Sequence, residues 1–369
     1  MRSPFLQNYK LDHIEILTPM ARTLAYWHVK ALGFHVTAYS GMDTGRPGFS
    51  SFVCRSGDVC LVLTSTYPML SGTVDDEVQA FINKHYCGVK RVSLLVDSVG
   101  EAFNSSIRNG AIPVQYPRKL EDGDGVIEEA AIKLYEDNEI VFINRSRYQG
   151  VFKPGYARAP AEAGGGWGGA FTSVDHIAAE VRINESQYWS EYLANAVGTS
   201  MVQSIGASDD NKTGMILKIN QTSDRLLTFV IAEPESYLKR SKVQKNIETF
   251  GPGIHHLAFA TKNLQETVRV LSQQGVEFVS FPPSYYDLLR KDNELHGSDI
   301  AALQRHGILL DKEGDSYLLQ KFIKPISDRP FFLYEIVERV NGYSGFALKN
   351  INVLKQAEEL EIMSRREQS

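Results

Sequence analysis

The chain repeats itself, and this repeat limits the folds open to it more than any other feature does. The segment LDHIEILTP contains His13, and the similar segment VDHIAAEVR contains His176, 163 positions later. CGVKRVSLLVDSV and PGIHHLAFATKNL form a second pair, in which His256 follows Arg91 by 165 positions. Because the two spacings nearly agree, they predict two copies of one structural unit.

A third matching pair locates an insertion in the second copy. EIVFINR ends at Arg145 and YEIVER ends at Arg339, which is 194 positions later, so the second copy holds about 30 additional residues before this point. The stretch PPSYYDLLRKDNELHGSDIAALQRHG is interpreted as that insertion, and its composition favours helices.

Each half runs as a strand, a helix and several further strands, twice over, which predicts an α+β fold with largely antiparallel sheets that curve around a central space. The stretch YARAPAEAGGGWGGAFTS separates the halves and indicates a linker, because a glycine-rich segment buries too little surface to order itself. We expect an N-terminal domain at 1–155, a linker at 156–171 and a C-terminal domain at 172–369. The final segment NINVLKQAEELEIMSRRE carries apolar residues three or four apart, which predicts a helix across the mouth of the cavity.

Composition excludes several classes of partner. The 369 residues are 43% hydrophobic and 22% charged, with a formal net charge of −5 and no dense basic stripe, so nucleic acid is a poor partner. No apolar run is long enough to cross a membrane, and the first residues lack the apolar block of a secretory signal. The three cysteines, Cys54, Cys60 and Cys87, show no metal-type spacing and fit a reducing cytoplasm.

Three residues of the second half predict a metal site: His176, His256 and Glu335. Two imidazoles and one carboxylate that leave open coordination positions are the arrangement of iron(II) oxygenases. A 2-oxo acid can chelate the metal through two oxygens and leave a third position for dioxygen. Taken singly, a histidine in a strand is more often a hydrogen-bonded core residue than a ligand.

The repeat strengthens this interpretation. In the alignment of the two halves, His256 corresponds to Arg91 and Glu335 corresponds to Val141. The first half therefore keeps only His13 of the three and is expected to bind no metal, so that His13 is structural. One functional copy and one degenerate copy are a common outcome of duplication.

These residues carry a family resemblance. The succession VDHI, GPGIHHLAF, PPSYYDLL and SYLLQKFIKPISDRPFFLYEIVER resembles 4-hydroxyphenylpyruvate dioxygenase and its sister family 4-hydroxymandelate synthase, and so do YWHVKALGFHVTAYSGMDTG and YQGVFKPGY of the first half. The resemblance covers nearly the whole chain. It implies a two-domain vicinal-oxygen-chelate fold of tandem βαβββ modules forming open barrels, with Fe(2+) held by His176, His256 and Glu335. It also implies a homo-oligomer and an oxidative decarboxylation of a 2-oxo acid by O2, with hydroxylation to a homogentisate-type product.

The same resemblance marks a substrate shell that departs from the family. It implies a catalytic glutamine at Gln320, and Phe322 matches the dioxygenase where the synthase usually has isoleucine. The usual asparagine of P-L-N-E-P is Ala232, and a glutamine of S-Q-I-Q is Lys242. The substrate contacts implied by the resemblance are Leu217, Ala232, Lys242, His255, Gln320, Phe322, Phe332, Phe346, Asn350 and Ile351.

Other functions remain open at this point. The same scaffold could hydroxylate the benzylic carbon, as 4-hydroxymandelate synthase does, or act on a different 2-oxo acid, because its substrate shell is altered. It could be a binding protein without catalysis, which the three intact ligands argue against. It could also hold zinc or manganese for hydrolysis or ring cleavage, although ring-cleaving relatives lack the YLLQxFxKPxxDRP stretch. His255 could either face the pocket or turn away toward the next strand.

Overall fold

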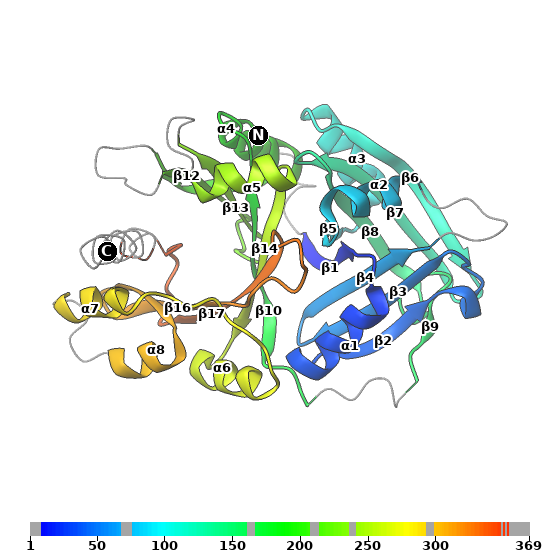
Figure 1. The fold of residues 1–369 in the computed structure, drawn as a ribbon. Helices are drawn as coiled ribbons and strands as arrows, with labels where there is room; N and C mark the ends of the chain where they lie inside the picture. The colour runs from blue at the N-terminus through cyan, green and yellow to red at the C-terminus, as the bar shows by residue number, and fades with distance from the viewer. Residues whose placement is uncertain are drawn as a thin grey trace.

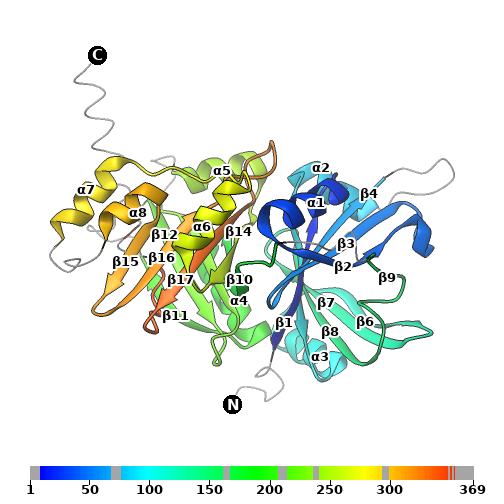
Figure 2. The same cartoon turned by 90° about the horizontal axis from the view of Figure 1, so that it is seen from below.

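The fold of the chain, seen in a computed structural model, consists of two curled sheets that lie side by side (Figure 1). The strands of the first half form one sheet and those of the second half form the other (Figure 2). The structure describes residues 9–67, 76–160, 167–206, 214–235, 241–292, 299–347, 350 and 353.

The first sheet has nine strands in the order β6-β7-β8-β5-β1-β4-β3-β2-β9. Its two central strands, β1 and β5, run antiparallel, and each pairs in parallel with the last strand of its own βαβββ unit. The elements are β1 Lys10–Leu17, α1 Ala21–Leu32, β2 His35–Ser40, the 3-10 helix η2 Met42–Thr44, β3 Phe49–Ser56, β4 Val59–Thr66, α2 Asp76–His85, β5 Gly88–Leu95, α3 Val99–Arg108, β6 Pro113–Asp122, β7 Gly125–Leu134, β8 Asn138–Tyr148 and β9 Ala157–Arg158.

The second sheet has eight strands in the order β11-β12-β13-β10-β14-β17-β16-β15. Its central strands β10 and β14 again run antiparallel, and β13 and β17 again close the two units in parallel pairs. The elements are β10 Phe171–Glu180, α4 Ser186–Val197, β11 Ser200–Ile205, β12 Met215–Gln221, β13 Thr228–Pro234, α5 Lys242–Phe250, β14 Gly253–Thr261, α6 Leu264–Gln273, α7 Pro283–Lys291, α8 Ile300–His306, β15 Leu309–Glu313, β16 Ser316–Phe322 and β17 Leu333–Val340.

The two sheets have the same topology, apart from the short β9, so the predicted duplication is visible in the strand order. The predicted insertion is also confirmed, because helices α7 and α8 fall between α6 and β15 and have no counterpart in the first half. They lie next to each other at the end of the second sheet that is away from the first sheet (Figure 1). Parts of the predicted linker extend the sheets, since Ala157–Arg158 form β9 and Phe171 begins β10.

A β-bulge interrupts the central strand pair at matching places in both halves. On β10, the pairing passes from Val174 to His176, so Asp175 is the additional residue, and Asp12 is the additional residue on β1. Neighbours in a regular strand point to opposite faces, whereas a bulge re-aims one of them. The bulges therefore allow each aspartate to contact the histidine that follows it.

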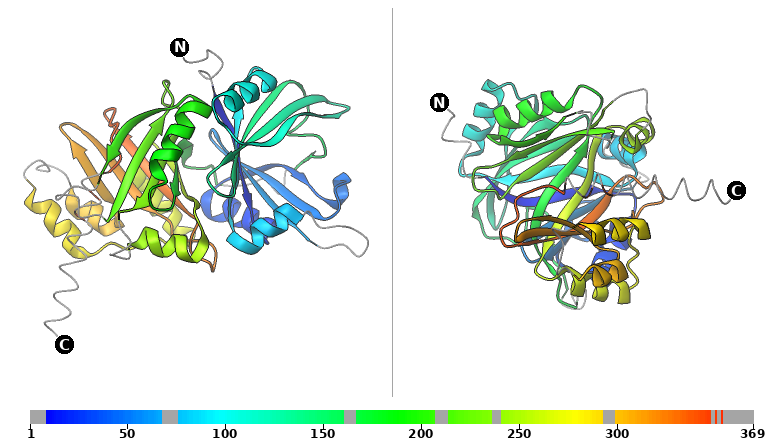
Figure 3. Two further views of the ribbon diagram at one scale, coloured as in Figure 1. Left: turned by 90° about the horizontal axis from the view of Figure 1, so that it is seen from above. Right: turned by 90° about the vertical axis from the view of Figure 1, so that its left-hand side faces the viewer.

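One core cluster continues from the first half into the second. Phe34 of the first half contacts the rings of Phe171 and Phe259, with centroids 5.8 and 6.1 Å apart. The fully buried His28 contributes a polar contact to this interface, because its Nε2 lies 2.8 Å from the hydroxyl of Tyr334. Burial lowers the pKa of His28 to about 4, so its ring is neutral at physiological pH. The two halves pack as one body (Figure 3).

Across the described ranges, no helix has both the length and the apolarity that a membrane crossing requires.

The His28–Tyr334 contact gives a stability prediction. His28 Nδ1 lies 2.7 Å from the carbonyl of Leu24, to which it donates, so Nε2 accepts a hydrogen bond from Tyr334. Tyr334→Phe leaves this buried acceptor without a donor and should cost about 1–3 kcal/mol of unfolding free energy. Urea unfolding followed by circular dichroism measures the loss. Tyr188→Phe, at a residue that is 49% exposed, is the control and should shift the midpoint little; equal shifts for both variants would contradict the prediction.

Candidate metal centre

Three neighbouring strands bring His176, His256 and Glu335 together. Their possible ligand atoms all lie within 4.8 Å of one another. Among the described residues, these three form the one group of His, Cys, Asp or Glu side chains close enough together to hold a metal ion. Oε2 of Glu335 lies 3.1 Å from Nε2 of His176 and 3.2 Å from Nε2 of His256. Glu335 is 1% exposed and His176 is 6% exposed, so the group is buried. Two nitrogens and one oxygen at this spacing suit a single divalent cation.

The strand register explains why residues so far apart in the chain meet. Ala258 on β14 pairs with His176 on one side and with Glu335 on the other. His256 lies two residues before Ala258 and therefore on the same face of β14. The small side chain of Ala258 leaves the space in which the three larger ones converge.

The register also tests the alignment of the two halves. In the first sheet, Ser93 takes the place of Ala258 and pairs with His13 and with Val141. Arg91 pairs with Glu15 as His256 pairs with Ala178. The correspondence of Arg91 with His256 and of Val141 with Glu335 is thus confirmed by the strand pairing.

An aspartate and an arginine hold His176 in place. Nδ1 of His176 lies 2.8 Å from Oδ1 of Asp175, and Arg339 binds both carboxylate oxygens of Asp175, at 2.7 and 2.9 Å. With Nδ1 donating to the carboxylate, Nε2 faces Glu335 and is the nitrogen that a metal ion would use. This contact was not predicted from the sequence, although Asp175 is adjacent to the predicted ligand and Arg339 ends the matching segment YEIVER.

The first half preserves the same arrangement without the other two ligands. Asp12 lies 2.5 Å from Nδ1 of His13 and is bound by Arg145 at 2.8 and 2.9 Å. Nε2 of His13 contacts the hydroxyl of Ser93 at 3.1 Å rather than a carboxylate.

Charges within the group favour a bound cation. Burial alone would lower the pKa of His176, but the carboxylates of Glu335 and Asp175 outweigh burial and raise it to about 9. Burial would raise the pKa of Glu335, yet the two histidines hold it at about 2. Burial and the neighbouring His176 lower the pKa of His256. The carboxylate thus retains its negative charge, and a proton on His176 supplies the compensating positive charge that a metal ion would replace.

Gln320, predicted to be catalytic, contacts the carboxylate of Glu335 rather than open space. Its Nε2 donates to Oε1 of Glu335 at 2.6 Å, and its own carbonyl accepts from the amide of Asn350 at 3.0 Å. The hydroxyl of Tyr285 donates to Asn350 at 2.6 Å, which completes the chain of hydrogen bonds. Both Gln320 and Asn350 are buried, so the two predicted residues position the Glu335 carboxylate.

Two of the three predicted phenylalanines border the metal group. The ring of Phe322 lies 5.9 Å from that of His256, and the ring of Phe346 lies 6.1 Å from that of His176. Phe332 lies elsewhere: it packs on Tyr334 at 5.2 Å in the core cluster. Phe332 was expected in the pocket, and the structure corrects this. Side chains alternate along a strand, so Leu333, two residues before Glu335, lies on the interior face and Phe332 does not. The same alternation would have identified Leu333 from the sequence.

The remaining predicted contacts fall into four groups. Leu217 and Ala232 pair with each other on β12 and β13. His255 faces inward beside His256, with their Nδ1 atoms 2.9 Å apart, because it is the additional residue of a second bulge. Lys242 is exposed at the start of α5, and its positive charge acts on the interior residues Glu180, His255 and His256. Ile351 and the predicted final helix lie outside the described residues, apart from Asn350 and Val353.

The chain was compared with known proteins, and no family model matches it. It is 30% identical over 368 residues to the 4-hydroxyphenylpyruvate dioxygenase of Coccidioides posadasii (strain C735), and the alignment covers 95% of this chain and 92% of that protein. It is 31% identical over 366 residues to the 4-hydroxyphenylpyruvate dioxygenase of Tetrahymena thermophila, and the alignment covers 95% of this chain and 89% of that protein. The chain belongs to the 4-hydroxyphenylpyruvate dioxygenase family.

Solved structures confirm the fold expected from the resemblance, the two-domain vicinal-oxygen-chelate fold of this dioxygenase family. A mutant of 4-hydroxymandelate synthase from Streptomyces coelicolor superimposes with a TM-score of 0.82 at 25% identity, over 96% of this chain and 99% of that chain. A fusion of a xylose isomerase-like TIM barrel with 4-hydroxyphenylpyruvate dioxygenase has a TM-score of 0.72 at 17% identity, over 95% of this chain and 52% of that chain. This second structure shares the fold alone.

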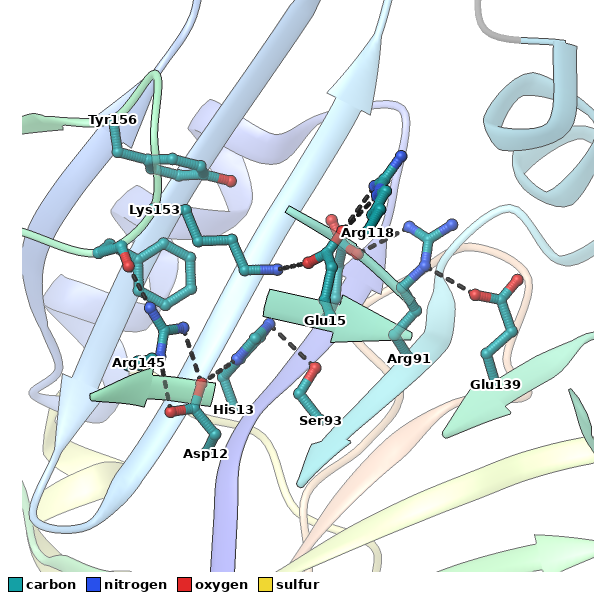
Figure 4. Close-up of polar contacts among 12 residues, drawn as sticks. Asp12, His13, Glu15, Arg91, Ser93, Arg118, Glu139, Arg145, Lys153 and Tyr156 are labelled. Atoms are coloured by element: carbon teal, nitrogen blue, oxygen red, sulfur yellow. Dashed lines mark hydrogen bonds and ion pairs between the residues drawn. The ribbon is translucent and has the colours of Figure 1, made fainter. Parts of the chain in front are cut away.

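Within this dioxygenase fold, the first half has an ion-pair network around Arg91, the residue at the position of His256 (Figure 4). Arg91, at the position of His256, binds Glu15 at 2.9 Å and Glu139 at 2.8 Å. Lys90 binds the other oxygen of Glu139 at 2.7 Å. Burial would lower the pKa of Arg91, but the two carboxylates raise it, so the guanidinium stays charged. A protein cation thus stands where the second half gathers ligands for a metal cation.

The matched histidines of the two halves give a direct test of the metal site. His176→Ala removes one of three ligands and should lower the iron content of protein loaded anaerobically with iron(II) by at least about tenfold. The control His13→Ala removes the equivalent histidine of the first half and should retain full iron content. Elemental analysis by mass spectrometry measures both. Equal iron loss in the two variants would show that the second half is not the metal site.

The Arg91 network gives a stability prediction for the first half. Arg91→Met leaves Glu15 and Glu139 buried without that partner and should cost about 3 kcal/mol of unfolding free energy. Arg118→Met removes an arginine that is 55% exposed and should cost less than about 1 kcal/mol. Chemical denaturation compares the two. An Arg91→Met protein as stable as the parent would mean that the network contributes nothing to the fold.

Proposed function

We propose that this chain is a non-haem iron(II) dioxygenase that oxidatively decarboxylates an arylpyruvate-type 2-oxo acid and hydroxylates it, with 4-hydroxyphenylpyruvate as the first candidate substrate. The observation that carries the proposal is the buried convergence of His176, His256 and Glu335 on three adjacent strands. Membership of a family whose relatives are named 4-hydroxyphenylpyruvate dioxygenase supplies the reaction class. Catalysis is assigned to residues 172–369, and residues 1–155 are assigned no metal.

The chain's own residues would position the reactants. Iron(II) bound by three protein ligands retains open positions for a 2-oxo acid and dioxygen, and it supplies the oxygen chemistry. Asp175 and Arg339 fix the ring of His176, while Gln320 holds one oxygen of Glu335 by a hydrogen bond and leaves the other free to coordinate. Gln320 therefore acts as a positioning residue.

Aromatic rings would line the space beside the metal. Phe322 lies next to the ring of His256, and Phe346 lies next to the ring of His176. Their rings offer apolar surface to an aryl side chain and limit the access of water to the reacting atoms. Arg339 also packs over the ring of Phe346, at 5.0 Å, which ties this wall to the charge pair that holds His176.

Benzylic hydroxylation to a 4-hydroxymandelate-type product is the second candidate function. It is favoured by the close structural match to 4-hydroxymandelate synthase. The dioxygenase outcome is favoured by the names of the relatives that match the chain in sequence. Phe322 also supports it, because the resemblance pairs phenylalanine at this position with the dioxygenase.

The compartment and the assembly state are part of the proposal. Cys54, Cys60 and Cys87 are all free and buried, which suits a reducing cytoplasm. A homo-oligomer is expected from the family resemblance, and sedimentation analysis of the purified chain would determine its size.

Anaerobic titration tests the function. Protein loaded with iron(II) should develop a visible charge-transfer band when a chelating 2-oxo acid is added, and admission of air should consume oxygen and release carbon dioxide. The expected product from 4-hydroxyphenylpyruvate is homogentisate, identified by mass spectrometry and chromatography; 4-hydroxymandelate would establish the second candidate instead. The control is Glu335→Ala, which should abolish the band and the oxygen uptake.

The proposal fails if no 2-oxo acid in a panel of aromatic and aliphatic acids produces either signal. Ligand binding without oxygen uptake would indicate the non-catalytic binding protein. Activity restored by zinc, or by manganese with a catechol, would indicate hydrolysis or ring cleavage.

A further inference from the structure

Glu180 is an acidic residue on the interior face of the second sheet that the reaction outlined above does not use. Ile177 and Ala179 of β10, and Val181 directly after it, belong to the core cluster between the halves. His176 points the other way, toward the metal group, and Glu180 shares its face because four residues separate them along a strand of period two. Glu180 therefore faces the same interior space as His176.

Strand pairing places Glu180 in a row with two apolar residues. Glu180 pairs with Ala232 on β13, and Ala232 pairs with Leu217 on β12. Side chains at paired positions lie side by side on one face of a sheet. Leu217 and Ala232 offer no hydrogen bond, so the carboxylate of Glu180 is the polar group of this row.

Glu180 is also close to the proposed metal group. Nε2 of His255 lies 3.8 Å from Oε1 of Glu180, and Nδ1 of His255 lies 2.9 Å from Nδ1 of His256. Only the ring of His255 therefore stands between Glu180 and a proposed metal ligand. Four residues of an extended strand span about 13 Å, so the row lies about that far along β10 from His176.

One oxygen of Glu180 has no partner. Asn246 donates to Oε1 at 3.1 Å, whereas Oε2 is buried and accepts no hydrogen bond from any described residue. Glu180 is only 6% exposed, and burial raises its pKa to about 8 despite the hydrogen bond from Asn246 and the charge of Lys242, because these do not fully offset the cost of burying the carboxylate. A donor delivered by a bound molecule would offset that cost.

The fold itself does not need an acid at this position. Glu180 pairs with Gly253, and in the first half the equivalent residue that pairs with Gly88 is Leu17. Leu17 is fully buried in an apolar cluster with Val78 and Phe81. The same strand position is therefore Leu17 in the first half and Glu180 in the half that holds the proposed metal site, where one of the two carboxylate oxygens lacks a hydrogen bond.

We propose that Glu180 determines substrate specificity by accepting, through Oε2, a hydrogen bond from an O–H or N–H group at the end of the substrate away from the metal. The inference rests on the proposed function and names its substrate class: an aromatic 2-oxo acid with a donor on its ring. Phenol, aniline and indole rings share this chemistry. An apolar row with one acceptor discriminates strongly, because a ring without a donor leaves the carboxylate unpaired.

Binding constants measured anaerobically on the iron(II) protein, by calorimetry and by the charge-transfer band, test the inference. The panel is phenylpyruvate, 4-hydroxyphenylpyruvate, 4-aminophenylpyruvate, indole-3-pyruvate and 4-methoxyphenylpyruvate, which accepts but cannot donate. At least one donor-bearing acid should bind about 10- to 100-fold more tightly than phenylpyruvate, and the methoxy acid should not.

Glu180→Leu copies the first half and should remove that preference while leaving the affinity for phenylpyruvate within about threefold. Glu180→Gln keeps the shape of the side chain and should reduce the preference partly, which provides a reading if the leucine variant does not fold. The matched control is Glu233→Gln, because Glu233 is equally buried but accepts a hydrogen bond from the backbone of Ser186 on the opposite face. It should leave the preference unchanged.

The outcomes separate this inference from the proposed function. If 2-oxo acids bind and are oxidised but the donor preference is absent, or survives in Glu180→Leu, the role of Glu180 is overturned while the function stands. If no 2-oxo acid binds to the iron(II) protein, both fail. A preference for the methoxy acid would also overturn the inference, because the carboxyl group would then be acting as a donor.

Discussion

The pairing of β14 with a strand on each side is the constraint on which the functional half depends. Ala258 lies between His176 and Glu335 in the ladder, and His256 follows from the alternation of side chains along the same strand. Backbone hydrogen bonds therefore fix where the three groups lie, and loops have no part in it. A register change of one residue in either pair would turn a ligand to the opposite face of the sheet.

Duplication gave the molecule two such ladders, and each half balances its interior charges differently. The second half gathers two histidines and a glutamate, whereas the first half places the guanidinium of Arg91 between Glu15 and Glu139. In both cases buried carboxylates meet a positive charge, as physical chemistry requires of buried acids. The difference is whether the cation is part of the chain or is taken from solution.

Much of this could be predicted from the sequence, because the repeat itself carries the information. Constant spacings aligned Arg91 with His256 and indicated the inserted helices, since a duplication preserves distances along the chain. The bulges and the cross-strand row could not be predicted, because they depend on which strands are neighbours. Phe332 was misplaced although the alternation of side chains along its strand, counted from Glu335, points to Leu333 instead, and Glu180 was overlooked although it lies only four residues after His176.

The paired aspartate and arginine of each half have a consequence for how the metal enters. Asp175 lies on β10 and Arg339 lies on β17, so their ion pair crosses the intervening strand β14 and stabilises the curvature of the sheet. Both partners of this ion pair belong to the chain itself, and Asp12 and Arg145 form the equivalent ion pair in the first half. The chain's own ion pair therefore supports the curvature that brings the imidazoles together. A metal ion bound by this group would not have to create that curvature.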